Sequence, residues 1–133
     1  MFQSFSKCSK CSKKFQKVMR SREAYLQSEC VRWFRLQFPK MAKLLIAVPN
    51  GGSRDAREAV NLKIQGVVAG VSDLLLLTPR NGFGCLCIEM KTETGKQSEL
   101  QVQWQKEAEN LGNKYVLCRT FDQFRSEILN YLN

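Results

Sequence analysis

Two acidic residues and one lysine carry the clearest chemical signal in this 133-residue sequence. Glu89 and Lys91 alternate with Ile88 and Met90, so a strand would place the two charged side chains on one face, roughly 7 Å apart. The simplest interpretation is an ion pair at a sheet edge, because charged groups are costly to bury without a partner. On this pair alone, that purely structural interpretation is the favoured one.

Asp73 changes the balance. It precedes a run of four leucines and by itself could be only a turn residue. Residues 80–84, Arg-Asn-Gly-Phe-Gly, are typical of a tight hairpin, which would bring Asp73 beside Glu89. Neighbouring carboxylates repel unless a proton or a cation lies between them. The group could hold Mg²⁺ or Mn²⁺ through oxygens, which would activate a water for attack on phosphorus, with Lys91 orienting or deprotonating that water.

The composition narrows the chemistry further. The sequence has no histidine, which excludes Ser-His-Asp hydrolases, histidine-dependent nucleases and most transition-metal sites. Cys8 and Cys11 have the spacing of half a zinc site, but there is no second such pair, so zinc is not expected there unless two chains share it. The other cysteines are expected to be small buried residues: Cys30, Cys85, Cys87 and Cys118.

The formal charge of +9 is concentrated at one end. Residues 1–22 contain seven lysines and arginines and no acidic residue, whereas the rest of the chain is nearly balanced. We predict a flexible basic arm over residues 1–20, either merely solvated or making salt-sensitive phosphate contacts, and a folded domain over residues 21–133. The absence of a signal sequence or a long apolar run predicts an intracellular, cytoplasmic protein.

Hydrophobic spacing and turn signals predict a compact α/β domain, an α+β mixed sheet flanked by helices. The expected order is α-β-α-β-β-α-β-α, over residues 23–38, 44–48, 53–65, 71–78, 85–91, 98–111, 115–119 and 120–132. The sixth element should begin at Ser98, carry an apolar stripe that includes a core residue, Trp104, and stop at Gly112.

These residues resemble the PD-(D/E)xK nuclease superfamily, through Asp73 and Glu89-Met90-Lys91. The flanking text is similar to the virus-type replication-repair nuclease (VRR-NUC) domain over about residues 22–133. The matching segments are Val48-Pro49-Asn50-Gly51-Gly52, Leu62-Lys63-x-x-Gly66, Gly70-Val71-Ser72-Asp73-Leu74, Ile88-Glu89-Met90-Lys91, Ser98-x-x-Gln101-x-x-Trp104 and Ile128-Leu129-Asn130-Tyr131-Leu132. One departure is Ser72, where the family usually has proline; serine can still form the turn.

The resemblance implies a restriction-endonuclease-like core and a divalent-metal-dependent DNA nuclease, often phage-encoded. Such enzymes act on branched or flapped DNA in replication, repair and recombination, the four-way Holliday junction included. Asp73 and Glu89 would be metal ligands and Lys91 the catalytic lysine. The family also has a glutamate on its first helix with a glutamine four residues later, which Glu23 and Gln27 match; Glu29 is the rival candidate for that glutamate.

Further candidates surround this site. Gln101 is expected either to contact the metal water or the scissile phosphate, or to cap its helix with Ser98, and both roles can hold. Residues expected to contact DNA, though each has a plainer turn or surface interpretation, are Asn50, Gly51, Gly52, Arg54 and Lys63. Because branched DNA has near two-fold symmetry, a homodimer is expected. The alternative function is a non-catalytic DNA-binding module with a nuclease-like fold.

Overall fold

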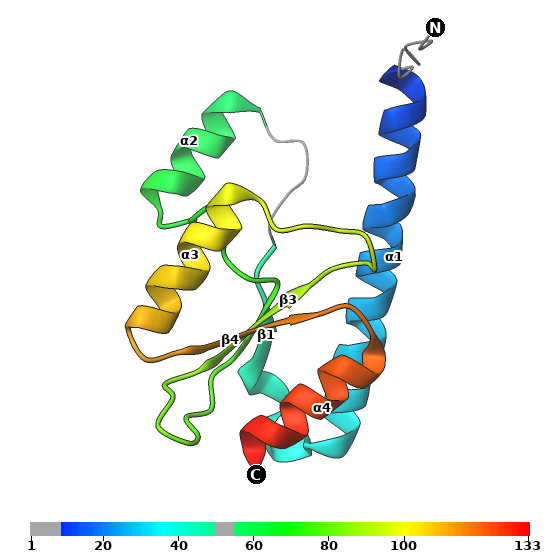
Figure 1. Cartoon of the computed structure of the whole chain (residues 1–133). Helices are drawn as coiled ribbons and strands as arrows, with labels where there is room; N and C mark the ends of the chain where they lie inside the picture. Colours follow the sequence, from blue (N-terminus) through cyan, green and yellow to red (C-terminus); the bar gives the residue numbers. More distant parts are fainter. Residues whose placement is uncertain (1–8, 50–54) are drawn as a thin grey trace, which may run out of the picture.

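The computed structural model describes residues 9–49 and 55–133, which form one mixed sheet with helices around it (Figure 1). The elements follow the predicted order, with one added 3-10 helix, η1. They are α1 (Ser9–Gln37), η1 (Pro39–Leu44), β1 (Leu45–Ala47), α2 (Ala56–Ile64), β2 (Leu74–Leu76), β3 (Leu86–Met90), α3 (Glu99–Asn110), β4 (Lys114–Cys118) and α4 (Phe121–Leu132). The predicted α+β fold class is confirmed.

The sheet has the order β1-β2-β3-β4, and its first three strands are antiparallel neighbours. A tight turn joins β2 to β3: Asn81 and Gly82 both have positive φ, 53° and 82°, as the hairpin prediction requires. β4 then runs parallel to β3 after the crossover through α3. Because Leu74 lies opposite Ile88, the residues one step further on, Asp73 and Glu89, also face each other across the hairpin.

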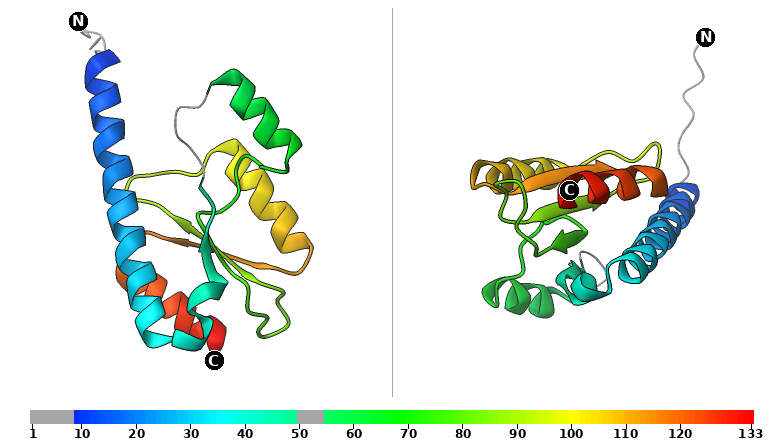
Figure 2. Two further views of the ribbon diagram at one scale, coloured as in Figure 1. Left: turned by 180° about the vertical axis from the view of Figure 1, so that it is seen from behind. Right: turned by 90° about the horizontal axis from the view of Figure 1, so that it is seen from below.

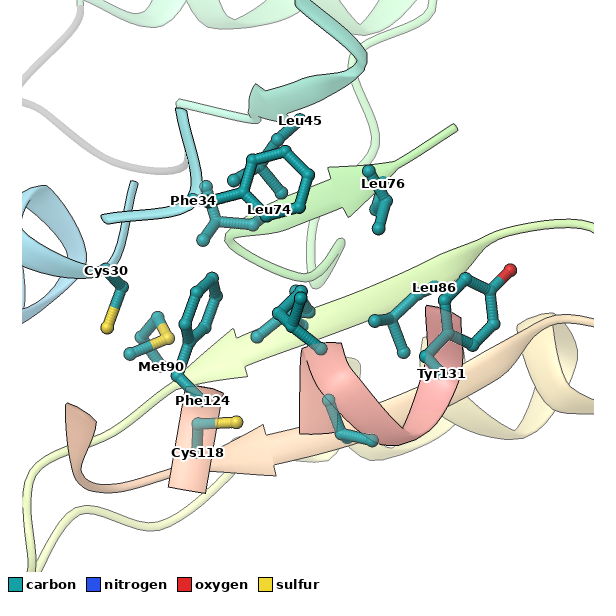
Figure 3. Packing of buried hydrophobic residues seen from close by; sticks show 13 residues of the cluster. Cys30, Phe34, Leu45, Leu74, Leu76, Leu86, Met90, Cys118, Phe124 and Tyr131 are labelled. Carbon is teal, nitrogen blue, oxygen red and sulfur yellow. The ribbon is translucent and has the colours of Figure 1, made fainter. Parts of the chain in front are cut away.

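One face of the sheet packs on α1 and α4. Figure 3 shows the buried side chains, with Phe34 of α1 and Phe124 of α4 meeting the strand residues Leu74 and Met90. Figure 2 shows α4 against the C-terminal half of α1. Each large apolar side chain buried in this way contributes about 1.5–3 kcal/mol. This packing fixes β3, the central strand that carries Glu89.

The opposite face of the sheet lies under α3, and it is less apolar than the sequence pattern suggested. Trp104 is half-buried against Tyr115 of β4, with ring centroids 6.2 Å apart, so it is not in the main core. Leu100 and Leu111, expected on the buried stripe, are 53% and 86% exposed. The reason is that α3 covers the polar end of β3, where Glu89 lies, and its own C-terminal end extends into solvent.

The first helix also begins earlier than predicted, at Ser9 rather than at residue 23. The segment from 9 to 22 has no glycine or proline and is rich in good helix formers, so it continues the helix whose C-terminal half packs on the sheet. Residues 9–20, expected to be an arm without fixed structure, are therefore helical. The division into an arm and a domain stays a prediction.

The predicted burial of the cysteines is confirmed for Cys30, Cys87 and Cys118, while Cys85 is half-buried. Cys8 lies outside the described residues, as does the side chain of Cys11, so the C-x-x-C pair stays a prediction. In the described parts of the chain, no helix is long and apolar enough to cross a membrane.

Candidate active site

The hairpin places two carboxylates together at one end of the sheet. Glu89 is on β3 and is only 1% exposed, although its strand neighbours Ile88 and Met90 turn to the apolar core. Asp73 immediately precedes β2 and is half-buried. Its Oδ2 accepts a hydrogen bond of 2.8 Å from the backbone N–H of Met90, which ties the start of one strand to the end of the other. The predicted pairing of Asp73 with Glu89 is therefore present.

Lys91 completes the local charge cluster. Its Nζ lies 3.4 Å from Oε1 of Glu89, and its side chain is 13% exposed. The ion pair expected from the sequence exists, but it sits on a central strand and not at a sheet edge. A largely buried lysine that keeps some exposure beside a buried carboxylate is available both to partner that group and to meet an approaching anion.

Burial and repulsion change the acidity of Glu89. Removal from water, and then the negative charge of Asp73, raise the pKa of the Glu89 carboxyl to about 8. The charge of Lys91 acts in the opposite direction but does not cancel the rise. The acid pair is thus short of positive charge, and Glu89 is protonated at neutral pH while no cation balances it.

Gln101 performs one of its two predicted roles, the capping of α3, and its contact to a metal water or to the scissile phosphate stays a prediction. Its Oε1 accepts from the backbone N–H of Ser98 at 2.8 Å, and its own N–H bonds to the Ser98 hydroxyl at 3.2 Å, so the predicted capping box is confirmed. Its Nε2 donates to Oε1 of Glu89 at 2.9 Å. One amide side chain therefore links the first turn of α3 to the buried acid.

A glycine allows α3 to come this close. Gly70, three residues before Asp73, has φ +87°, and a Cβ added there would lie 2.5 Å from the backbone oxygen of Leu100. The chain leading to Asp73 therefore runs directly against the first turn of α3. No side chain larger than hydrogen fits at this contact without moving the backbone.

Two hydrogen-bonding residues at the site were not found from the sequence. The Tyr115 hydroxyl donates to Oε2 of Glu89 at 3.5 Å and accepts from Gln97 at 3.1 Å, while Gln97 also bonds to Gln105 at 2.9 Å. The signal that could have identified Tyr115 is the parallel register, which sets Tyr115 beside Cys87, two residues before Glu89. That register depends on the crossover through α3 and is not visible in the strand itself.

The loop after β3 is fixed by a third such residue. Arg119, directly after β4, donates from Nη1 to the backbone oxygens of Thr92 and Gly95, both at 2.7 Å, and to that of Glu93 at 3.3 Å. From the other side, Oε1 of Glu23 on α1 accepts from the Thr92 N–H at 3.4 Å. The loop that follows Lys91 is held between α1 and β4.

The comparisons with known proteins agree with this arrangement. Residues 11–122 match the sequence model of the VRR-NUC domain, which is most of the chain. The chain belongs to the VRR-NUC family. The family is of nuclease type, so this is a nuclease-like domain that acts on DNA.

A solved structure supports the same VRR-NUC fold. It is described as a VRR_NUC domain protein and superimposes with a TM-score of 0.72 at 24% sequence identity, covering 83% of this chain and 87% of its own. No curated protein matches the sequence.

The other residues that were predicted on the first helix lie at different distances from the site of this VRR-NUC domain. Glu23, and not the exposed Glu29, faces the loop after Lys91. Among the described residues, no three acidic or cysteine side chains form a metal-binding group, and a ligand role for Glu23 beside Asp73 and Glu89 stays a prediction. Gln27 is half-buried on α1.

Four of the five predicted DNA contacts lie outside the described residues: Asn50, Gly51, Gly52 and Arg54. Lys63 is exposed in the last turn of α2, where a phosphate contact and a plain surface charge are equally compatible with its position.

Proposed function

We propose that this VRR-NUC domain is a divalent-metal-dependent DNA endonuclease that hydrolyses phosphodiester bonds in branched or flapped DNA. One observation supports the proposal above the others: two carboxylates face each other at the ends of β2 and β3, with the ammonium group of Lys91 3.4 Å from one of them. Asp73 places a second negative charge beside this ion pair and raises the pKa of Glu89, an arrangement that a cation between the two carboxylates would stabilise.

The donor set fits Mg²⁺ or Mn²⁺. Both cations prefer oxygen ligands, and Mg²⁺ sites commonly use one or two carboxylates, with water and substrate phosphate completing the shell. Asp73 and Glu89 supply those carboxylates, and their mutual repulsion is the electrostatic defect that a cation corrects. Such a cation, when bound, supplies an activated water and stabilises the negative charge on the phosphoryl group.

The chain's own side chains set up the rest of the reaction. Lys91 lies where it can orient or deprotonate the attacking water and balance the charge on the phosphate. Gln101 and Tyr115 hold the two oxygens of Glu89 in place, so the carboxylate does not swing away when it ionises. Glu23 accepts a hydrogen bond from the backbone of the loop after Lys91 and so helps to hold that loop in place.

Cleavage of a substrate panel tests the proposal. Labelled four-way junctions, flaps, forks, linear duplex and single strands are incubated with purified protein in Mg²⁺, in Mn²⁺ and in EDTA. We expect cutting near the branch points with either metal and none in EDTA. Intact substrates under every metal condition would contradict the proposal, and tight binding without cutting would favour the alternative of a non-catalytic DNA-binding module.

We also propose that the domain works as a homodimer. A branched substrate with near two-fold symmetry offers two equivalent strands, and two copies would place one active site on each. Light scattering at assay concentrations, with and without junction DNA, should give the mass of a dimer. A mass of one chain in both conditions would contradict this part of the proposal.

A further inference from the structure

The first helix carries a line of positive charge that leads away from the candidate active site. Lys13, Lys17 and Arg20 follow helical i, i+4, i+7 spacing, and Lys14 lies beside them. All four side chains are exposed. We name this set the arm face.

The arm face begins next to the site and projects beyond the body of the protein. Glu23, three residues after Arg20, contacts the loop that follows Lys91. From that point towards Ser9, α1 stands clear of the other elements in both Figure 1 and the left view of Figure 2. Ten residues separate Lys13 from Glu23, which is about 15 Å along a helix.

The same line continues past the site without an acidic group. Ala24, Ser28, Val31 and Arg35 keep the spacing on the C-terminal side. Glu29 lies on the opposite side of α1, and Glu23 lies beside the line, where it contacts the loop after Lys91. The line itself is therefore neutral or positive.

The charges of the arm face have no ion-pair partner among the described residues. Among the described residues, the ion pair that forms is that of Lys91 with Glu89, and none involves Lys13, Lys14, Lys17 or Arg20. Like charges three and four residues apart weaken a helix, and positive charge near a helix N-terminus opposes the helix dipole. The arrangement costs the free protein stability, and a line of phosphates would relieve both effects.

From these features we infer that the arm face binds the phosphate backbone of one duplex arm of the substrate, leading away from the cleaved bond. The inference rests on the proposed function for the choice of DNA. At about 3.4 Å per nucleotide along one strand, a helix segment of about 15 Å spans about four to five base pairs. Side chains on a helix have regular positions, so they suit a duplex, whose phosphates also lie at regular positions, better than a flexible strand.

Binding measured in EDTA tests this inference without requiring cleavage. The arm variant combines Lys13→Gln, Lys14→Gln, Lys17→Gln and Arg20→Gln. A matched control removes the same charge from exposed residues elsewhere: Lys40→Gln, Lys43→Gln, Lys106→Gln and Arg125→Gln. Glutamine is a good helix former, so circular dichroism and Tm should show both variants folded.

The expected result is a change in salt dependence. For four phosphate contacts, the slope of log K against log salt should be less steep by about 3.6 in the arm variant. The control should change it by less than about 1, the value for one contact. Equal changes in the two variants, or none in the arm variant, would overturn the inference.

Shortening the DNA gives a second, independent readout. Wild-type affinity should drop when one duplex arm is cut to fewer than about five base pairs beyond the branch, and the arm variant should not respond to the same shortening. Two results would show that the arm face does not bind a duplex. One is a wild-type affinity that does not depend on arm length, and the other is full affinity for a single-stranded arm of equal length. Because these are binding results, a failure of cleavage would leave them interpretable.

Discussion

The end of β3 and the N-terminal half of α1 hold their charges in opposite ways. Glu89 is almost completely buried, and Gln101, Tyr115 and Lys91 all contact its carboxyl group. Lys13 and Lys17 are exposed, and among the described residues no acidic side chain pairs with them. Each region is electrostatically incomplete, one lacking positive charge and the other lacking negative charge.

The difference separates chemistry from binding. Because Glu89 is buried, its carboxyl group interacts strongly with nearby charges. Only a small ligand can reach it and balance its negative charge, which suits a cation. Because the lysines are exposed, the attraction of each one to a phosphate is weak. A row of them adds up on a polyanion, and the resulting binding depends on salt concentration. The two regions should therefore fail in different assays.

The largest expected effect is the loss of cutting without loss of binding. Alanine at Asp73, Glu89 or Lys91 removes an interaction with the reacting groups, so single-turnover cleavage should fall by at least about 100-fold. In EDTA, affinity for junction DNA should be slightly higher for Asp73→Ala, which removes a negative charge near the phosphate, and unchanged for Glu89→Ala, whose carboxyl group carries a proton without metal. Lys91→Ala removes one positive charge and should weaken binding only slightly. The arm variant should show the reverse, with weakened binding and a near-normal rate at saturating protein. If the variants of both regions lost cleavage alone, or lost binding alone, the two regions would not have the separate roles proposed for them.

The pH dependence of stability should belong to the buried region. The folded protein holds a proton on Glu89 up to a pKa of about 8, whereas the unfolded chain releases it near 4.5. Between those values the folded state binds more protons, so the free energy of unfolding in EDTA should fall as pH rises, by about 1.4 kcal/mol per pH unit from this group.

Denaturant titrations across pH 4–9 measure that slope. Glu89→Gln cannot ionise, so its free energy of unfolding should change less with pH than that of wild type between pH 4.5 and 8. Below pH 4.5 the two slopes should be nearly equal. The arm variant keeps every carboxyl group and should follow the wild-type slope. A Glu89→Gln protein with the wild-type slope would show that the buried acid is not the source.

Packing around the site should be less tolerant than packing at an exposed turn. Gly70→Ala places a methyl group against the Leu100 backbone at a positive φ, and we expect it to reduce the free energy of unfolding by about 1–3 kcal/mol and to slow cleavage by displacing Gln101. Gly66→Ala is the control, since φ is +107° but nothing lies within 4 Å, so only the backbone cost of about 1 kcal/mol remains. Equal losses in urea unfolding would mean that α3 moves easily away from Asp73.

The smallest expected effect comes from one hydroxyl group. Tyr115→Phe removes a donor to Glu89 at the long distance of 3.5 Å, so stability should fall by no more than about 0.5–1 kcal/mol, and the pKa of Glu89 should rise because its charged form loses a hydrogen bond. Tyr25→Phe, at a 70% exposed position on α1, should change neither quantity. The unfolding measurements described above should be repeated with both variants. An effect of Tyr25→Phe as large as that of Tyr115→Phe would contradict the distinction between the regions.

The sequence predicted the parts of the site that depend on local patterns. Alternation along β3, the Asn81-Gly82 turn and the Ser98–Gln101 capping box each involve residues close in the chain, and all three are present in the structure. The order of helices and strands along the chain was predicted for the same reason, because each element has its own local pattern.

Features that depend on distant contacts were missed. Tyr115 reaches Glu89 only through the parallel register of β4, and Arg119 reaches the loop after β3 across the same crossover. The apolar spacing of α3 predicted a buried stripe, but its first turn lies over a buried acid, and Leu111, after its last turn, is left in solvent. The basic segment looked like a tail because it has no core to pack on, although its helix propensity and the packed half of α1 are sufficient to keep it helical.

The central claim is that Asp73 and Glu89 form a metal-dependent site that cuts DNA, and a magnesium titration of cleavage tests it most directly. Protein and labelled junction are first freed of metal with a chelator, and the single-turnover rate is followed as Mg²⁺ is added. For wild type, the account predicts a rate that rises from background to a plateau, and for Asp73→Asn a rate that stays at background at equal occupancy of DNA. Wild-type cutting that persists in EDTA, or Asp73→Asn cutting at the wild-type rate, would contradict it.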